Sequence, residues 1–393
     1  MQLGLVIYGS LGTMTGGYLY DRKLVEHLRQ HGDTVQVFSL PPRGYARNLV
    51  DQRSRDWIRR LSAAALDMLL EDELAHPSLL RVNRHIRRQV GTPILSIVHH
   101  LRSSEPYPRV PRSLYRNVER QYLRGVDGWI CNSRVTLAAV QDVAGADRPA
   151  LVAPPAGDRL GPGLAANAIA ARARRSGPVR IAYVGSLTPR KGLHILLAAL
   201  ARVPPESWTL TVIGSDQWDT VYASRIRRQI VDACWTGRVE LLGDINDSEL
   251  AARLAASDLL AVPSTYEGFG IAYLEGMAFG LPALASSAGG AREVVRPGET
   301  GILIDPGDIP GLARAISTLA SDREVLERMS LAARRHFETQ PGWAASTHQI
   351  RAFLTHPAFR APEAQNRTIG LSRGSSSFMR TVRSMRGMLI APG

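Results

Sequence analysis

Residues 179–200 read VRIAYVGSLTPRKGLHILLAAL, and this stretch decides the fold. An apolar run over 179–184 is followed by a turn that contains glycine and then by an apolar helical run over 193–200. Strand, turn and helix in this order predict a parallel sheet with helices packed on its faces. The pattern continues downstream, with strands predicted at 208–213, 239–242 and 259–262 and a helix at 248–256.

The same alternation opens the chain. An apolar run at 3–8, a glycine-rich turn, a helical pattern at 18–29 and a second apolar run at 34–40 predict a first α/β unit. Further strands are predicted at 93–98 and 128–131. Two doubly wound units in one chain predict a ligand cleft between them.

Composition shifts suggest where these units end. A polar stretch rich in Pro, Gly and Arg precedes residue 179 and is predicted to be a linker. We expect a first α/β domain over 1–170, a second α/β domain over 179–342, a helix over 343–358 that returns towards the first domain, and a basic, largely disordered tail over 360–393.

Composition and charge limit the class of protein. With 45% hydrophobic and 21% charged residues, the 393-residue chain is neither fibrous nor wholly disordered. No stretch resembles a membrane span or a signal peptide, and two isolated cysteines, Cys131 and Cys234, favour a cytoplasmic protein. Residues 1–178 carry 25 basic against 15 acidic groups, and 351–393 carry 7 against 1, so we expect an anionic partner at these regions.

Two adjacent cations, Arg190 and Lys191, stand where the turn after the first decisive strand enters a helix. Cations beside the free N–H groups of a helix N-terminus form an anion site. Arg dominates the basic residues of this chain, and Lys occurs only at positions 23 and 191. The competing interpretation is a solvated surface pair, and the residues alone leave both open.

A second cluster lies between Pro263 and Pro282. A strand ends at Pro263, and a helix begins near Gly270 and ends before Pro282. Glycines at 268 and 270 allow close backbone approach to a ligand, and carboxylates at Glu267 and Glu275 suit paired sugar hydroxyls. Because Glu275 lies in an otherwise apolar run, a solvated surface role is disfavoured.

The spacing of Glu267 and Glu275 resembles the paired-glutamate signature of retaining glycosyltransferases of family 4, which have the GT-B fold of two Rossmann-like domains facing a central cleft. The resemblance extends through segments 239–244, 248–251, 258–264, 289–290, 293–295 and 298–306. It is close over about residues 179–340 and looser over 1–150.

The resemblance implies that the first domain, 1–170, binds the acceptor and that the second, 179–342, binds the nucleotide sugar. It also implies roles for individual residues. Arg190 and Lys191 would hold the donor diphosphate, and Glu275 would bind the ribose. Further contacts to the diphosphate would come from Gly16, Gly17, Gly270 and Ile271, and contacts to the donor sugar from Glu267, Gly268, Phe269 and Gly270. Many members have Arg where this chain has Ser186, so the division of labour between Arg190 and Lys191 is not fixed by the resemblance.

Strand ends supply further candidates. His99 ends the strand at 93–98, and a His at that place faces the donor sugar in the resembling family, so His99 and Glu267 are the predicted catalytic residues. The following loop offers His100, Arg102 and Glu105 as weaker acceptor contacts. Backbone near Gly214, Leu241 and Gly243 is the weak prediction for the base.

No Asp-x-Asp motif occurs in the chain, so we expect no metal and no cofactor, and a nucleoside-diphosphate sugar would act as co-substrate. Arg190, Lys191 and a helix start can neutralise a departing diphosphate electrostatically. Glu267 would stabilise positive charge on the sugar ring. The predicted activity is transfer of a hexose-type sugar to an acceptor hydroxyl of a glycolipid, a polysaccharide or a small molecule.

Two basic stripes raise the question of a membrane surface. Within 377–390, apolar residues Phe378, Val382, Met385 and Leu389 oppose Arg380, Arg383 and Arg386, which is typical of an interfacial amphipathic helix. The second stripe, Arg112, Arg116, Arg120 and Arg124, is predicted to be a solvated helix face. The expected location is cytoplasmic, with peripheral contact to the inner face of a membrane as one option.

Two alternatives stay open. One is another GT-B enzyme, such as a sugar-nucleotide epimerase, against which the glutamate pair and Arg190-Lys191 argue. The other is a non-catalytic basic nucleic-acid-binding protein, which predicts aromatic residues among clustered cations. Aromatic residues make up only 6% of the chain and residues 179–350 are net acidic, so no nucleic acid is expected as a partner.

Overall fold

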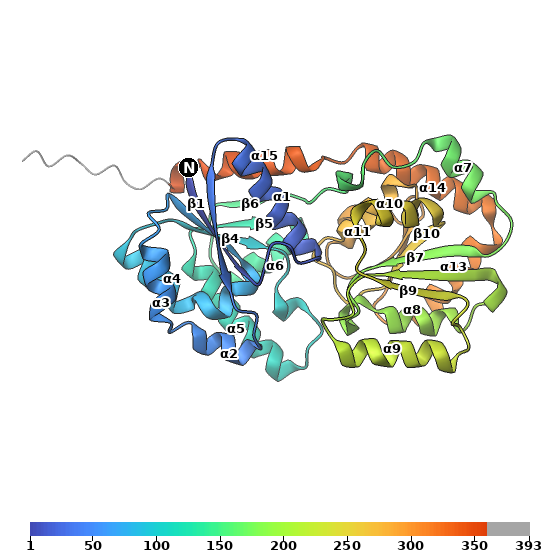
Figure 1. Cartoon of the computed structure of the whole chain (residues 1–393), viewed down its shortest axis with the longest axis horizontal. Coiled ribbons are helices and arrows are strands. Elements are labelled where there is room, and N and C mark those ends of the chain that lie inside the picture. Colours follow the sequence, from blue (N-terminus) through green and yellow to red (C-terminus); the bar gives the residue numbers. More distant parts are fainter. Residues whose placement is uncertain (360–393) are drawn as a thin grey trace, which may run out of the picture. The chain divides into compact units, whose positions relative to one another are not determined.

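The computed structural model describes residues 1–359, which form two parallel six-stranded sheets with helices on their faces (Figure 1). The first sheet has the strand order β2-β1-β3-β4-β5-β6. Its strands are β1 (Gln2–Tyr8), β2 (Thr34–Leu40), β3 (Met68–Asp72), β4 (Ile94–Val98), β5 (Gly128–Cys131) and β6 (Ala150–Val152). Its helices are α1 (Gly16–Gln30), α2 (Tyr45–Asp51), α3 (Arg55–Ser62), α4 (His76–Gln89), α5 (Arg109–Gly125) and α6 (Arg134–Ala144).

The second sheet has the strand order β12-β11-β10-β7-β8-β9. Its strands are β7 (Val179–Val184), β8 (Trp208–Ile213), β9 (Val239–Gly243), β10 (Leu259–Val262), β11 (Ala283–Ser286) and β12 (Gly301–Ile304). Its helices are α7 (Ala166–Ala173), α8 (Leu193–Leu200), α9 (Thr220–Asp232), α10 (Asp247–Ala256), α11 (Ile271–Ala278), α12 (Ala291–Val294), α13 (Ile309–Ser321) and α14 (Arg323–Glu338). In Figure 1, α10 and α11 lie above this sheet and α8 and α9 below it.

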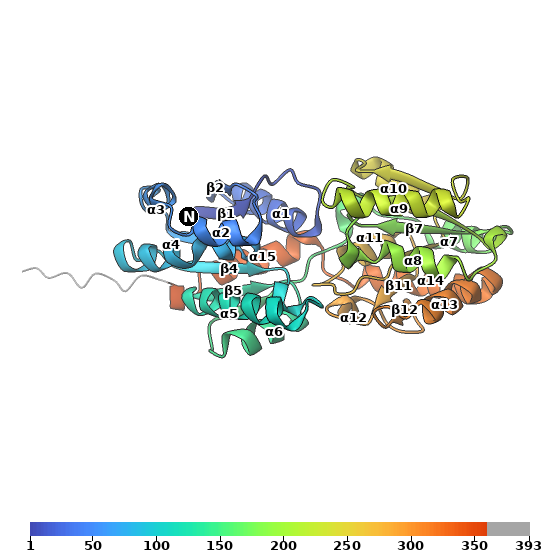
Figure 2. The same cartoon turned by 90° about the horizontal axis from the view of Figure 1, so that it is seen from below.

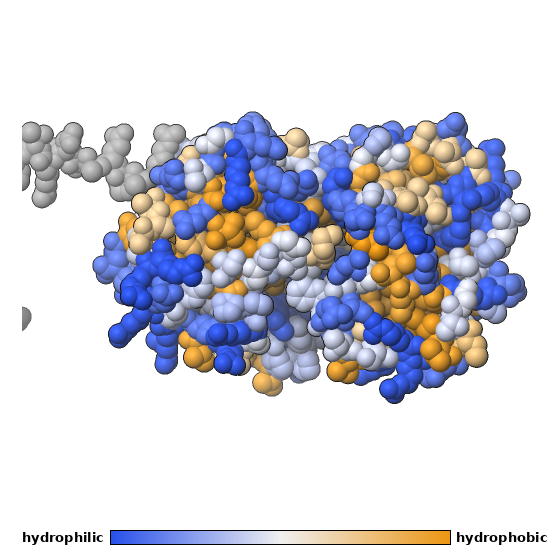
Figure 3. Space-filling view, in the orientation of Figure 1, coloured by the Kyte–Doolittle hydropathy of each residue, from blue (hydrophilic) through white to orange (hydrophobic). Residues whose placement is uncertain are grey.

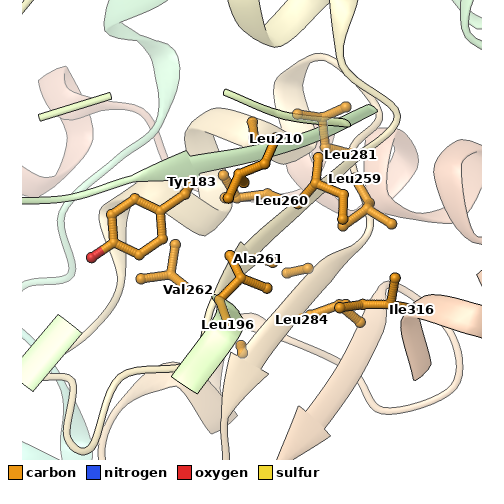
Figure 4. Close-up of a cluster of buried hydrophobic side chains, with 14 of the residues drawn as sticks. Tyr183, Leu196, Leu210, Leu259, Leu260, Ala261, Val262, Leu281, Leu284 and Ile316 are labelled. Atoms are coloured by element: carbon orange, nitrogen blue, oxygen red, sulfur yellow. The ribbon is translucent and has the colours of Figure 1, made fainter. Parts of the chain in front are cut away.

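Apolar strands explain why the second sheet is covered on both faces. Leu259, Leu260, Ala261 and Val262 of β10 are all buried, as parallel strands between two helical layers require. Figure 4 shows these side chains in one apolar cluster, with Leu196 of α8 and Leu284 of β11 among its members.

The last described α-helix, α15 (Trp343–Leu354), lies beside α1 in both views (Figures 1 and 2). Trp343 and Tyr20 meet edge to face at 5.8 Å between ring centroids, and Arg351 pairs with Asp33 just after α1. The segment that follows the second sheet therefore packs on the first one.

Each sheet has one point at which its strand order reverses: between β1 and β3 in the first sheet, and between β7 and β10 in the second. Ligands of open α/β sheets bind beyond the carboxyl ends of the strands at such points. A ligand is therefore expected at the loops that follow these four strands.

The predicted α/β architecture is confirmed. The strands at 34–40, 128–131, 179–184, 208–213 and 259–262 and the helix at 193–200 have the predicted bounds. The amphipathic helix predicted over 377–390 and the disordered tail over 360–393 lie outside the described residues. None of the helices within residues 1–359 combines the length and hydropathy that crossing a bilayer requires.

The basic stripe on α5 was predicted to be a solvated face, and Arg112 and Arg124 are exposed while Arg116 and Arg120 are half-buried. Arg116, Arg120 and Arg124 donate to the carbonyl oxygens of Asp142, Val143 and Ala144, which end α6. Cations at a helix C-terminus are favoured because the last carbonyl groups carry partial negative charge. The stripe is therefore largely a helix-capping device, although hydrophilic residues do cover much of the face seen in Figure 3.

Candidate functional site

The loops after β7 and β10 bring Lys191, Arg190 and Glu267 together. The short helix η4 (Pro189–Lys191) follows β7, and its Lys191 Nζ donates to Glu267 Oε1 at 2.7 Å. Ser264, just after β10, donates to the same oxygen at 2.5 Å, and Arg190 Nη1 lies 3.9 Å from Glu267 Oε2. The predicted diphosphate cations and the predicted sugar carboxylate thus form one cluster.

Charge complementarity keeps this buried cluster ionised. Glu267 is 5% exposed, and burial alone would raise its pKa, but Lys191 and Arg190 lower the pKa to about 2. Burial also lowers the pKa of Lys191, against the opposing effect of Glu267. A carboxylate held ionised at neutral pH can stabilise a cationic sugar ring.

The start of α11 completes the cluster. Gly270 precedes the helix with a φ of 102°, a conformation that favours glycine, and the ring of Tyr273 lies 2.4 Å from where a Cβ would stand. The first N–H groups of a helix have no partner within it and attract anions. Ile271, which opens α11, lies 3.4 Å from the Cβ position of Gly16, so two predicted diphosphate contacts are neighbours.

His99 lies where loops of both sheets meet. Its ring is 3.1 Å from the Cβ position of Gly17, and its carbonyl oxygen is 2.1 Å from the Cβ position of Gly268. Ser133 after β5 donates to the carbonyl oxygen of Gly268 at 2.8 Å. Gly17 and Gly268 are therefore required for close approach, and they bring His99 to the Glu267 loop.

Three buried acids surround His99. Its ring Nε2 is 3.5 Å from Asp21 Oδ1, and its backbone N–H donates to Glu73 Oε2 at 3.0 Å. Burial lowers the pKa of His99, but Asp21, Asp72 and Glu73 raise it to about 9. Burial raises the pKa of Asp72 to about 7 and also raises that of Glu73, which favours shared protons in this acidic cluster.

Among the described residues, one group has the spacing of metal ligands: oxygen and nitrogen atoms of Asp21, Asp72 and His99 lie within 4.8 Å of one another. The cluster belongs to the first sheet, whereas Arg190 and Lys191 belong to the loop after β7 in the second. The absence of a metal and of a cofactor from the reaction stays a prediction.

Glu275 lies in the middle of α11 and is 3% exposed. Arg159 Nε donates to its Oε1 at 2.5 Å, and Arg159 Nη1 also pairs with Asp247 at the start of α10. Burial raises the pKa of Glu275, and Arg159 opposes that rise. The predicted ribose ligand is thus paired with an arginine from the segment that links the two sheets.

The residues predicted for the base line one pocket. Gly214, Leu241 and Gly243, at the carboxyl ends of β8 and β9, surround about 230 Å³ together with Leu187 and Asp216. Leu187 belongs to the loop that leads to Arg190, so the pocket adjoins the diphosphate cations along the chain. Its mixture of apolar walls and backbone groups can accept a planar heterocycle.

The weaker acceptor candidates lie after β4. His100 Nε2 is 2.9 Å from Glu105 Oε1, and Glu105 Oε1 is 4.0 Å from Arg190 Nε. Arg102 is surrounded instead by the rings of Tyr45, Tyr107 and Tyr115, with its Cζ 4.8 to 5.4 Å from their centroids. His100 and Glu105 therefore lie near the Arg190 side of the cluster, and Arg102 is held in an aromatic cage.

Sequence reasoning missed several residues of the site. Ser264 binds Glu267, Arg159 binds Glu275, and Asp21, Asp72 and Glu73 surround His99. The run Glu71-Asp72-Glu73 carried a signal, since acids that directly follow an apolar pair can end a buried strand. Arg159 carried none, because an Arg in a polar linker has no periodic pattern around it.

Comparison with known proteins shows a family similarity over the second sheet. Residues 166–336 match the family model described as glycosyl transferases group 1. A glycogen synthase of Mycobacterium tuberculosis is 34% identical over 187 residues, which is 46% of this chain and 44% of that protein. A D-inositol 3-phosphate glycosyltransferase of Geodermatophilus obscurus is 32% identical over 267 residues, 64% of this chain and 57% of that protein. The chain thus spans about half the length of the curated relatives it matches.

Solved structures extend the likeness of fold to the first sheet. Sucrose-phosphate synthase from Thermosynechococcus elongatus superposes with a TM-score of 0.77 at 23% identity, covering 89% of this chain and 97% of that one. Anabaena HepE, solved in complex with UDP-glucose, gives 0.71 at 22% identity, covering 90% and 99%. The predicted GT-B fold is confirmed, and so is the resemblance over the second sheet.

Proposed function

We propose that the chain is a retaining glycosyltransferase, because residues 166–336 match the family model of glycosyl transferases group 1 and the chain has the GT-B fold. It moves a hexose-type sugar from a nucleoside-diphosphate donor to an acceptor hydroxyl, without a metal. The observation that carries this proposal is the convergence of Lys191, Arg190, Glu267 and the start of α11.

Each part of the cluster has a chemical task. Arg190, Lys191 and the first N–H groups of α11 neutralise the departing diphosphate. Glu267, ionised at neutral pH, stabilises the oxocarbenium-like ring as the bond to the diphosphate breaks. His99 faces the sugar from the first sheet, and the acceptor attacks from the side of the leaving group.

Thermal shift against UDP, GDP, ADP and TDP sugars tests the donor. A donor at 100 times its dissociation constant stabilises the fold by about 2.7 kcal/mol. Lys191→Ala should abolish the shift, whereas Glu267→Ala should lose turnover more than nucleotide binding. Lys23, the only other lysine of the chain, pairs with Glu26 on the surface, so Lys23→Ala is the matched control. No shift with any donor, or a product that is only an epimerised donor, would contradict the proposal.

We also propose peripheral contact of the enzyme with an anionic membrane surface, which would suit a glycolipid acceptor. Residues 1–178 are strongly basic, and Val110 and Leu114 of α5 are 80% and 51% exposed. We expect anionic vesicles to sediment the full chain more strongly than a chain that ends at Phe359, and neutral vesicles to sediment neither. Equal sedimentation of the two chains by anionic vesicles would rule out a contribution from residues 360–393.

A further inference from the structure

Arg159 is the one strong partner of Glu275 among the described side chains. Its guanidinium bridges Glu275 Oε1 and the carboxylate of Asp247, and its own side chain is 10% exposed. A buried ion pair of this kind contributes little net stability, because desolvating both charges costs about as much as their attraction returns. A role in ligand binding accounts for the arrangement better than a role in stability.

The pair leaves one carboxylate oxygen available. Within residues 1–359, Glu275 Oε2 accepts no hydrogen bond. It is also not one of the fully buried polar atoms that lack a partner, so it keeps some exposure to solvent. Each carboxylate oxygen has lone pairs for two donors. Arg159 therefore fixes the orientation of the carboxylate at one oxygen and leaves the other for hydroxyl donors.

The backbone around Arg159 is fixed as firmly as its side chain. The short helix η3 (Asp158–Leu160) packs against α10 and α11, and a Cβ on Gly157 would stand 2.7 Å from the backbone of Leu274. Asp158 accepts the N–H of Trp343 at 3.2 Å, where α15 begins. The guanidinium thus approaches Glu275 from a rigid support.

We propose that Arg159 is a positioning residue for the nucleotide: it holds Glu275 as an oriented carboxylate whose free oxygen reads the ribose hydroxyls. This inference rests on the proposed function, because it takes a nucleoside diphosphate as the ligand. Hydrogen bonds to an ionised acceptor are about twice as strong as neutral ones. Burial raises the pKa of Glu275, so without Arg159 the carboxyl would be easier to protonate and less suited to accept from hydroxyls.

The test compares two ligands by calorimetry: the nucleoside diphosphate of the base that the thermal-shift panel selects, and its 2′,3′-dideoxy analogue. The wild type should bind the ribose form at least about tenfold more tightly, as expected for charge-assisted hydrogen bonds. Arg159→Gln should bring the ratio of the two dissociation constants close to one, and Arg159→Lys should restore part of it. Inorganic pyrophosphate should bind equally to all these variants.

A double-mutant cycle separates positioning from direct contact. Glu275→Gln should also remove the preference for ribose, and adding Arg159→Gln to it should change nothing further. Arg334 binds the carbonyl oxygens of Pro162 and Ala278 on the same two segments without touching Glu275, so Arg334→Gln is the matched control and should keep the preference. If Arg159→Gln does not fold, Asp247→Asn, which weakens the exposed end of the same bridge, should still lower the preference.

The outcomes distinguish the two proposals. A wild type that binds none of the four nucleoside diphosphates contradicts the proposed function. A wild type that binds one of them without preferring ribose, or an Arg159→Gln variant that keeps the full preference, overturns the role of Arg159 alone. A variant that loses affinity equally for both ligands and for pyrophosphate also overturns it, since that pattern indicates a structural role.

Discussion

The carboxylate of Glu267 is buried, yet it accepts from Lys191 and Ser264 and remains ionised far below neutral pH. The usual rule that buried acids become protonated is reversed here by two adjacent cations. The same cations are the predicted diphosphate ligands. We therefore expect an incoming diphosphate to compete with Glu267 for Lys191, which would couple the proposed sugar-facing carboxylate to the presence of the leaving group.

This ionisation makes stability depend on pH. The folded-state pKa of Glu267, about 2, lies below its ordinary 4.5, so its contribution is fully present above pH 4.5 and is lost as the pH falls towards 2. The shift corresponds to about 3 kcal/mol. Urea unfolding from pH 7 to pH 3 should show that Glu267→Gln has a smaller loss of stability over this range than the wild type. Glu26, exposed beside Lys23, is the control, and Glu26→Gln should follow the wild-type curve.

Individual residues also show where sequence reasoning stops. Glu267, Arg190 and Lys191 could be selected because they border a strand end and a helix start, and the structure brings them together. Arg159 and Asp21 could not be selected from the sequence, since their roles depend on how a linker and a helix face are placed in three dimensions. The local sequence pattern identifies ligand-binding residues at strand ends, whereas the residues that orient their side chains come from elsewhere in the chain.

Secondary-structure elements differ in how clearly the sequence marks them. The apolar runs of β7, β8 and β10 are bounded by Gly or Pro and were predicted with their observed limits. β3 was missed because its five buried residues include Glu71 and Asp72, which a pattern based on hydropathy rejects. β6 was missed because it has only three residues, too few for a period to be recognised.

The entry into α11 is the element on which the anion site depends. Gly270→Ala would place a Cβ against the ring of Tyr273 in a left-handed backbone, at a cost of roughly 1–3 kcal/mol, and would displace the first N–H groups of the helix. We expect nucleotide affinity to fall at least about tenfold, which is 1.4 kcal/mol, as measured by calorimetry.

Gly298→Ala is the matched control for this prediction, because Gly298 also has a positive φ but has open space around its Cβ position. It should lose stability and keep nucleotide affinity. If both variants bind the nucleotide equally well, the start of α11 is not part of the anion site.

At the scale of the whole molecule, loops from both sheets meet at His99 and Gly268. Asn132 and Ser133 after β5 hold the carbonyl oxygens of His99 and Gly268 at 2.8 Å each, and Glu293 of α12 accepts the N–H groups of Arg134 and Val135 at the start of α6. The candidate site is thus assembled from two sheets, and neither sheet carries it alone. Two α/β units could be predicted from the sequence, but not these contacts, since each joins a side chain to a backbone atom of a distant loop.

Catalysis should therefore be more sensitive than donor binding to a change at this meeting point. Gly268→Ala would place a Cβ 2.1 Å from the carbonyl oxygen of His99 and force the two loops apart. Because Arg190, Lys191 and the base pocket all belong to the second sheet, the dissociation constant for the nucleotide should change less than about threefold, whereas kcat should fall on the order of 100-fold. Gly237→Ala, at an open position on the second sheet's surface, should leave both quantities unchanged. Equal losses in kcat and nucleotide affinity for Gly268→Ala would mean that the Glu267 loop collapses as a whole, and that the contact with His99 has no separate role in turnover.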